Sequence, residues 1–162
     1  MKKFLLFLIT VTFYGQADLK ISLEEELETL MPKVIEWRHD IHQHPELGNR
    51  EFRTSNKIKV HLESLGIEVE SGIAYTGLVG MIEGGKPGPT IALRADMDAL
   101  PIHEQTGLDY ASKVEGAMHA CGHDGHTAML LGAAKYLCET RNFDGTAVMI
   151  FQPAEEGGGG GK

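Results

Sequence analysis

The chain has 162 residues, of which 42% are hydrophobic and 23% are charged. This ordinary globular composition predicts one folded domain, or part of one, and excludes a disordered chain. The formal net charge is −8, and no cluster of Lys and Arg stands out along the sequence. Because binding to DNA or RNA needs a basic patch that displaces counterions, we expect no nucleic-acid partner.

The first residues have the pattern of a secretory signal peptide. Two lysines precede an apolar run over residues 4–14, and the tripeptide Gly-Gln-Ala at 15–17 has small residues where a signal peptidase inspects the chain. We therefore expect residues 1–17 to be removed on export and the mature domain to cover residues 18–162. A membrane anchor and a buried terminal segment are the alternatives, but the run has about half of the roughly 20 residues that span a bilayer. No membrane span is expected after cleavage.

Two amphipathic helices are predicted next. Apolar residues recur every three or four positions over residues 23–41, and Pro32 is expected to kink or break this first helix. A turn-like segment follows at residues 44–48. A second helix is predicted to run to about Leu65, where Gly66 ends it. Both helices are expected to cover a sheet.

Four short apolar runs bounded by Gly, Pro or Asp are predicted to be strands. They are Ile67–Val69, Leu78–Ile82, Thr90–Leu93 and Thr146–Phe151. The segment EGGKPG at 83–88 has the composition of a hairpin-type loop between the second and third strands. A helix predicted over about 125–140 separates the third strand from the fourth, which is the βαβ order of a parallel pair. The predicted fold class is therefore α/β, with a mixed, largely parallel sheet covered by helices.

Polar residues cluster in three loops at the ends of predicted strands, where α/β sheets place their sites. The loops are RADMDALP (94–101), HACGHDGH (119–126) and QPAEEGGGG (152–160). Cys121 and His123 are two positions apart, so in an extended loop both side chains point to one side and form a two-ligand arm for a metal ion. Asp124 is predicted to cap the following helix, whose dipole favours a thiolate at Cys121. A loop thiol beside a helix cap is the alternative.

Cys121 is predicted to be a free thiol, although export would favour a disulfide. The other cysteine, Cys138, lies roughly 20 Å away along the predicted helix, whereas a disulfide needs Cα atoms within about 7 Å. Cys138 is expected to be a small buried residue of that helix. His119 and His126 are left as neighbours of the site, substrate contacts or bystanders.

Acidic residues in the other two loops complete the candidate metal site. Glu155 and Glu156 are adjacent and would repel each other unless a cation lies between them or one is protonated. A metal ion meets that need, with one carboxylate as a ligand and the other as the base that takes a proton from water. Asp96 and Asp98 share a face at the end of the third strand, where either would be placed to orient a metal-binding imidazole. The alternatives are a solvated loop for the glutamates and turn or cap roles for the aspartates.

Two other classes of function, phosphate binding and redox chemistry, fit the sequence less well than a metal site. Gly-Lys at 161–162 would end a phosphate-binding loop only if Gly stood at position 156, but that residue is Glu156, whose charge repels phosphate. A redox role for Cys121 needs a low-pKa thiolate and a nearby resolving cysteine, and the sequence contains no Cys-x-x-Cys. Both classes are therefore disfavoured.

Four segments, in order, resemble the signature blocks of the M20 metallopeptidase family, and of its amidohydrolase branch in particular. They are RHDIHQHPELGNREFRTSNKI (38–58), LRADMDALPIHEQTGLDYAS (93–112), MHACGHDGHTAMLLGAA (118–134) and FQPAEEGGGGGK (151–162). Members of this branch act on N-acyl amino acids, hippurate and auxin conjugates. The resemblance implies a Zn-exopeptidase-like catalytic domain of which this chain is the N-terminal part. It also implies an inserted lid or dimerisation domain elsewhere in the full-length protein, which allows a homodimer.

The resemblance further implies roles for individual residues. Cys121, His123 and Glu156 would be ligands in a two-metal centre filled by Mn or Zn, with Co or Ni as other choices, and Glu155 would be the general base. Other branches have His-x-Asp where this chain has Arg-Ala-Asp at 94–96, and the resemblance implies that the thiolate of Cys121 would take that ligand's place. The family's two further histidine ligands would lie outside this chain.

The sequence therefore predicts an exported, metal-dependent enzyme that hydrolyses the amide bond of a small N-acyl amino acid or amino-acid conjugate. The alternative is a truncated, catalytically inactive fragment of the same family that binds metal weakly at most.

Overall fold

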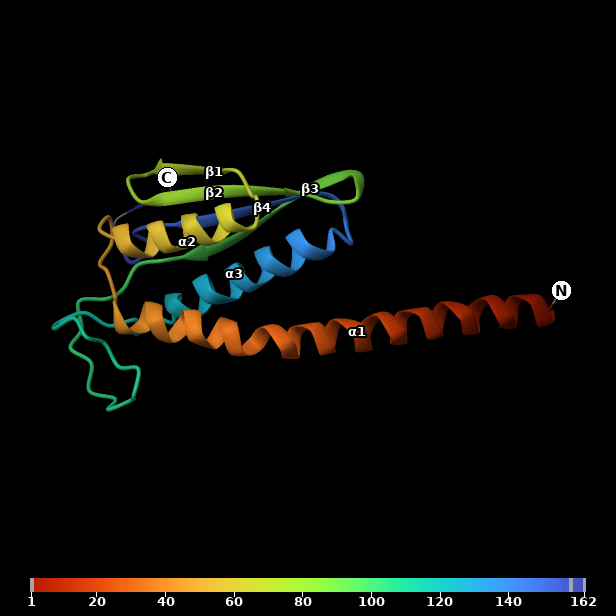
Figure 1. The fold of residues 1–162 in the computed structure, drawn as a ribbon, viewed down its shortest axis with the longest axis horizontal. Helices are drawn as coiled ribbons and strands as arrows, with labels where there is room; N and C mark the ends of the chain where they lie inside the picture. The colour runs from red at the N-terminus through yellow and green to blue at the C-terminus, as the bar shows by residue number, and fades with distance from the viewer. Residues whose placement is uncertain (1, 158, 162) are drawn as a thin grey trace. The chain divides into compact units, whose positions relative to one another are not determined.

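The computed structural model describes residues 2–157 and 159–161, with side chains from residue 23 onward. Its elements are α1 (Lys2–Gln43), α2 (Phe52–Ser64), β1 (Val69–Ile73), β2 (Gly77–Glu83), β3 (Lys86–Asp96), α3 (His123–Thr140) and β4 (Asp144–Gln152). The chain divides into two compact units, one up to Lys33 and one from Val34 onward, so α1 contributes to both. The second unit contains the sheet, α2, α3 and the last part of α1 (Figure 1).

Helix α1 runs through Pro32 without a break. The predicted break is wrong, because a proline removes one backbone hydrogen bond but lets the turns on either side continue a helix. The predicted signal peptide at 1–17 lies within α1, apart from Met1, which is outside the described residues. Among the described residues, no helix is long and apolar enough to cross a membrane.

Helix α2 ends where the sequence predicted. Glu46, in the turn before it, accepts hydrogen bonds from the backbone N–H groups of Arg53 and Thr54 at 2.9 and 2.8 Å. These bonds satisfy two amides of the first turn, which have no partner inside a helix. At the other end, Gly66 adopts a left-handed φ of 76°, a conformation that terminates helices and favours glycine. The predicted stop at Gly66 is confirmed.

The four strands form one mixed sheet in the order β1-β2-β4-β3. β3 and β4 are parallel and are joined through α3, which confirms the predicted βαβ order. β2 is antiparallel to both β1 and β4, so the described sheet has more antiparallel pairing than the largely parallel sheet expected. The hairpin predicted at 83–88 is wrong, because β4 lies between the two strands that this loop connects.

Other differences concern the ends of elements and one cysteine. β1 begins at Val69, and Ile67 precedes it as a buried core residue instead of belonging to the strand. α3 begins at His123, two residues earlier than predicted. Cys138 lies in α3 but is only half-buried, with its Sγ 3.3 Å from the Leu65 carbonyl oxygen.

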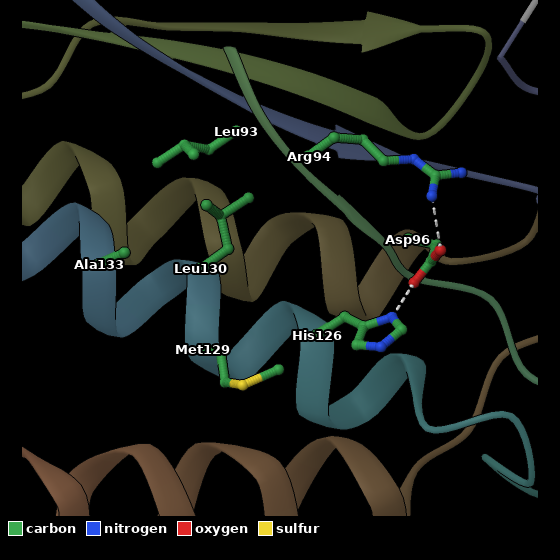
Figure 2. A pocket seen from close by; sticks show the side chains of 7 residues that line it. All are labelled: Leu93, Arg94, Asp96, His126, Met129, Leu130 and Ala133. Atoms are coloured by element: carbon green, nitrogen blue, oxygen red, sulfur yellow. Dashed lines mark hydrogen bonds and ion pairs between the residues drawn. The ribbon is translucent and has the colours of Figure 1, made fainter. Parts of the chain in front are cut away.

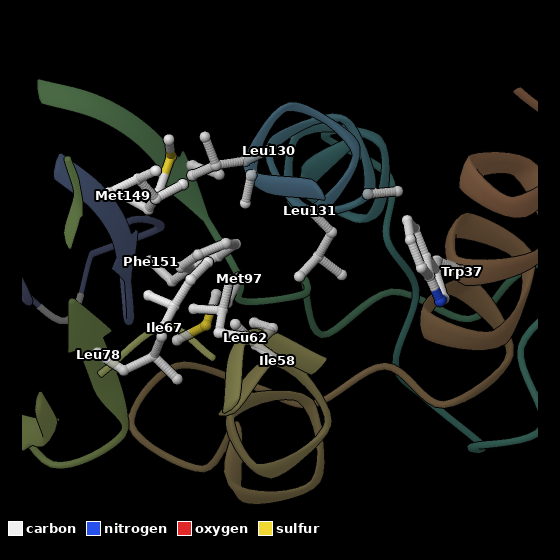
Figure 3. Close-up of a cluster of buried hydrophobic side chains, with 14 of the residues drawn as sticks. Trp37, Ile58, Leu62, Ile67, Leu78, Met97, Leu130, Leu131, Met149 and Phe151 are labelled. Carbon is white, nitrogen blue, oxygen red and sulfur yellow. The ribbon is translucent and has the colours of Figure 1, made fainter. Parts of the chain in front are cut away.

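The hydrophobic core fills the space between the sheet and two helices, α2 and α3, that pack together on one of its faces (Figure 3). Alternate residues of β4 are buried, as the two-residue period of a strand requires. The largest fully buried side chains of the core include Ile58, Leu62, Leu78, Ile82, Met97, Leu131, Met149 and Phe151. Each stabilises the fold by about 1.5–3 kcal/mol through leaving water. Because β3 and β4 are parallel, their carboxyl ends meet at one edge, where α3 begins.

Candidate metal centre

Side chains from the predicted loops meet at the carboxyl ends of β3 and β4. The ligand atoms of Cys121, His123 and Glu156 lie within 4.8 Å of one another, so the predicted convergence is observed. His123 Nε2 lies 3.9 Å from Glu156 Oε1 and 3.9 Å from Glu155 Oε2. The side chains of Glu155 and Glu156 are 40% and 25% exposed, so both carboxylates border the solvent. The fold therefore brings a thiol, an imidazole and two carboxylates together.

His123 is held in one ring orientation by Asp98. Its Nδ1 lies 2.9 Å from the backbone oxygen of Asp98 and 3.2 Å from Asp98 Oδ1. A carbonyl oxygen can only accept, so Nδ1 carries the hydrogen and the neutral ring has its lone pair on Nε2. Nε2 is the atom that faces Glu155 and Glu156. This geometry agrees with the hypothesis that Asp98 orients a metal-binding imidazole.

The first turn of α3 differs from the prediction. Its N-cap is Gly122, in a left-handed conformation with φ of 91° and without a capping side chain. The prediction that Asp124 caps the helix is wrong, since Asp124 lies buried inside the first turn. The helix is tied to the sheet by Thr127, whose hydroxyl donates to the Asp96 carbonyl at 2.8 Å. This bond places the start of α3 against the end of β3.

Cys121 is an exposed free thiol, as predicted. Its pKa is raised, first by a hydrogen bond with Glu156, then by the loss of some hydrating water and by the charges of Glu156, Glu155 and Asp96. The predicted preference for a thiolate is therefore wrong, because the nearby carboxylates outweigh the dipole of one helix. A bound cation would reverse this balance by pairing the thiolate with positive charge.

A second group of possible ligands shares His123. Asp96, His123 and His126 offer ligand atoms within 4.8 Å of one another. Asp96 is also engaged within the protein: His126 Nδ1 lies 2.7 Å from its Oδ1, and Arg94 Nη1 donates to its Oδ2 at 3.0 Å (Figure 2). Burial raises the pKa of Asp96, but the hydrogen bond from His126 and the charges of His123 and His126 outweigh it, so the pKa is lowered.

The pairing of His126 with Asp96 was not predicted from the sequence. The sequence contains one signal that His126 lies near the candidate site. His123 and His126 are three residues apart, and such residues share one face of a helix. A cavity of about 380 Å³ opens beside this pair (Figure 2). Its polar end is formed by Arg94, Asp96 and His126, and its apolar wall by Leu93, Met129, Leu130 and Ala133. An apolar wall with a few polar groups at one end is typical of small-molecule sites.

A buried polar network on the other side of the same turn was also missed. Asp124 Oδ2 lies 2.9 Å from His42 Nδ1 and accepts a hydrogen bond from Arg38 Nε at 3.1 Å. His42 Nε2 lies 3.3 Å from Glu104 Oε1. His119 is 3% exposed, and neither of its ring nitrogens has a hydrogen-bond partner in the described part of the chain. Burial lowers the pKa of His119 to about 4.

The donor set fits a divalent cation. A thiol, an imidazole nitrogen with a free lone pair and a carboxylate are the protein ligands that zinc and similar ions take. Cys121, His123 and Glu156 supply one ligand atom of each of these three kinds. The buried carboxylate behind His123 supplies the outer hydrogen bond that such ligands have in metal proteins.

The part of the chain that contains Cys121, His123 and Glu156 is similar to known proteins. Residues 92–162 match the model of peptidase family M20/M25/M40. The chain is 49% identical over 144 residues to thermostable carboxypeptidase 1 of Saccharolobus solfataricus, and 49% identical over 142 residues to hippurate hydrolase of Campylobacter jejuni. Both matches cover 88% of this chain and 37% of the relative.

A solved structure shows the same relationship. The Bacillus subtilis YXEP protein, a dinuclear metal-binding peptidase from the M20 family, matches with a TM-score of 0.75 and 49% identity, over 80% of this chain and 37% of that protein. The chain belongs to peptidase family M20. Its mixed α/β fold is that of M20 peptidase domains, so the predicted fold class and family are confirmed. The M20 chain described here spans 37% of the length of these relatives.

Proposed function

We propose that this M20 chain is part of a metal-dependent amidohydrolase that cleaves the amide bond of small N-acyl amino acids or amino-acid conjugates. The meeting of Cys121, His123 and Glu156 beside a second, more exposed carboxylate, Glu155, carries the proposal. The similarity to hippurate hydrolase of C. jejuni supports this substrate class, since hippurate is itself an N-acyl amino acid. The substrate would be a small molecule and not a nucleic acid.

We assign two divalent cations to the centre, Mn or Zn, with Co or Ni as alternatives. Two observations support this number: the similar YXEP protein is dinuclear, and two groups of possible ligands share His123 here. The thiolate and imidazole favour Zn, whereas the carboxylates favour Mn. When bound, the cations would polarise the scissile carbonyl and lower the pKa of water at the site.

Glu155 is the general base in this proposal. Its carboxylate is the more exposed of the pair and lies 3.9 Å from His123 Nε2, so it borders both the ligand group and the solvent. It would take a proton from the attacking water and pass it to the leaving amine. Glu156 hydrogen-bonds with Cys121, and its backbone N–H donates to Asp98, which suits a fixed ligand.

Substitution of Glu155 should impair turnover, whereas substitution of Glu156 should impair metal binding. In the full-length protein, Glu155→Gln should keep its metal but lose roughly 10²–10⁴-fold in kcat, the range of general-base catalysis. Glu156→Gln removes a charged ligand, so metal content should fall and excess metal should restore part of the activity. Metal stoichiometry and turnover of an N-acyl amino acid are measured side by side for both variants.

Each outcome has a defined meaning. Loss of metal from Glu155→Gln together with full metal and rate in Glu156→Gln would reverse the two assignments. Unchanged turnover in both variants would rule out the hydrolase mechanism. Metal binding without turnover by the 162-residue chain alone would support the alternative of an inactive fragment.

We also propose that the protein is exported after removal of residues 1–17, and that the full-length form is a homodimer. The lysines and short apolar run at the N-terminus support export, because this order of residues is that of a signal peptide. N-terminal sequencing of secreted protein should find Asp18 first. A secreted chain that still begins at Met1 would contradict the cleavage, and a monomer in sedimentation would contradict the dimer.

A further inference from the structure

Two side chains beside the metal centre are buried with some of their polar atoms unpartnered. His119 is 3% exposed, and neither of its ring nitrogens has a hydrogen-bond partner among the described residues. Asp124 is 1% exposed, and its Oδ1 is also unpartnered within that part of the chain, although Oδ2 contacts Arg38 and His42. Because buried polar groups in folded proteins are almost always hydrogen-bonded, these atoms point to a bound partner.

The two side chains belong to one polar region. The ring of His119 lies 6.3 Å, centroid to centroid, from the ring of His42, whose Nδ1 is 2.9 Å from Asp124 Oδ2. Burial lowers the pKa of His119, and the charge of Asp124 is the largest effect that opposes this lowering. Because the interaction between charges weakens with distance, the Asp124 carboxylate lies near the ring.

The partner of these atoms must be small and able both to donate and to accept. A ring nitrogen does one or the other according to the tautomer, whereas a carboxylate oxygen only accepts. His119 is already enclosed by the described residues, which puts its ring out of reach of side chains from the rest of the full-length protein. Among the described residues, neither His119 nor Asp124 belongs to a group of three ligand atoms within 4.8 Å, so a cation does not fit. Water does fit, because a buried molecule makes about two to four hydrogen bonds to such groups.

The segment around His119 has few other attachments. In the part of the chain that the structure describes, residues 119–121 form no backbone hydrogen bond, whereas Met118 before them and Gly122 after them do. Cys121 lies in this segment and is exposed. The buried ring of His119 is therefore the polar group that can fasten the segment from inside.

We propose that internal water binds His119, and that one such molecule joins its ring to Asp124 Oδ1. His119 is then a positioning residue, because through this water it fastens the segment that carries Cys121 to the helical turn that carries His123. The effect on metal binding rests on the metal centre proposed above, whereas the water site does not. A water-mediated hydrogen bond is nearly as favourable in enthalpy as a direct one, so it can join two segments whose side chains do not touch.

A crystal structure of the full-length protein tests the water site. We expect a water oxygen about 2.7–3.2 Å from one His119 nitrogen and from Asp124 Oδ1. His119→Phe has a ring without nitrogens and should lose this water, whereas His119→Gln has an amide that donates and accepts and should keep it. Absence of the water oxygen from a structure that shows other buried waters would overturn the inference. Protein atoms bonded to both ring nitrogens would overturn it as well.

Co²⁺ binding tests the positioning role. His119→Phe should weaken Co²⁺ binding by roughly 10–100-fold, the range for loss of a group that supports a metal ligand. It should also reduce the thiolate-to-metal absorption band of Cys121 for each bound ion. His119→Gln should restore the affinity and the band. The matched control is His103→Phe, which makes the same change at an exposed residue. Equal affinity and an equal band in His119→Phe and His103→Phe would overturn the positioning role.

Failure of the metal centre can be told apart from failure of this inference. If the unchanged protein binds no Co²⁺, the metal centre is wrong, and hydrogen exchange on the metal-free protein decides the positioning role. The Gly125 amide, which donates to the Gly122 carbonyl at 2.9 Å, should then exchange faster in His119→Phe than in His103→Phe. Equal exchange rates would overturn the role. Should His119→Phe fail to fold by far-UV circular dichroism, His119→Leu takes its place in every comparison.

Discussion

The two sides of the first turn of α3 differ in how their carboxylates are paired with positive charge. On the open side, His123 lies among Cys121, Glu155 and Glu156, where acceptors and negative charge predominate. On the buried side, Asp124 is paired with Arg38 and His42. A buried carboxylate that has its own protein cation contributes to the fold, whereas carboxylates gathered around an imidazole and a thiol favour a cation from outside or a proton. Adjacent residues of one helix therefore face a buried ion-pair network on one side and the proposed metal centre on the other.

The largest effect on stability is expected on the buried side. Asp124→Ala leaves the buried His42 with only Glu104 as a carboxylate partner and should lower the free energy of unfolding by about 3 kcal/mol, at the low end for a broken buried pair because Arg38 is half-exposed. Urea unfolding at pH 7 measures it. Glu115→Ala, an exposed site, serves as the control. A loss no larger than in the control would mean that the network is not stabilising.

On the open side, a divalent cation should stabilise the chain instead. Zn²⁺ or Mn²⁺ at a free concentration of about 100 times Kd should raise the free energy of unfolding by about 2.7 kcal/mol, because it binds the folded form. EDTA should reverse the gain, and Glu156→Gln should lose most of it. Thermal unfolding with and without metal is the measurement. An equal gain in Glu156→Gln would remove Glu156 from the ligand set.

His119 should make the buried side sensitive to acid. Burial lowers its pKa from 6.5 to about 4, so its contribution is fully present above pH 6.5 and is lost as the pH falls toward 4. Between pH 7 and pH 5 the free energy of unfolding should drop by roughly 2 kcal/mol from this residue alone. His119→Gln should show a correspondingly smaller drop in urea unfolding at the two pH values. Equal drops would contradict the lowered pKa.

The smallest effect is expected at His126. Its side chain is 50% exposed, so its pair with Asp96 should be worth no more than about 1 kcal/mol. His126→Ala should therefore change urea unfolding far less than Asp124→Ala does. A similar loss of unfolding free energy in both variants would contradict the proposed difference in stability between the two sides of the turn.

Local patterns explain what the sequence predicted correctly. The second helix, its stop at Gly66 and the βαβ order depend on periodicity and on residues that are close in the chain. The same patterns could not place β4 between β2 and β3, because strand order depends on which faces bury the most apolar surface across the whole sheet. The wrong hairpin at 83–88 followed from that limit.

The candidate site shows the same division between features that local patterns predict and contacts that they do not. Residue types and loop positions were enough to point to Cys121, His123 and the Glu155–Glu156 pair, since strand ends gather at one edge of a sheet, whereas the choice of Glu156 as the ligand came from the family resemblance. The supporting contacts were not predictable in this way. Glu51 lies 103 residues from Ala154, and Arg38 lies 86 residues from Asp124. No periodic pattern links residues at such separations.

The sequence by itself determined the chemistry available to this protein: one thiol, an imidazole and two adjacent carboxylates in loops that follow predicted strands. The tertiary structure decided which of these groups face one another, which His123 nitrogen is free and which carboxylates are buried as supports. The physical reason is that ligand types are properties of single residues. Orientation, burial and pKa arise only when distant segments exclude water and supply each other's hydrogen bonds.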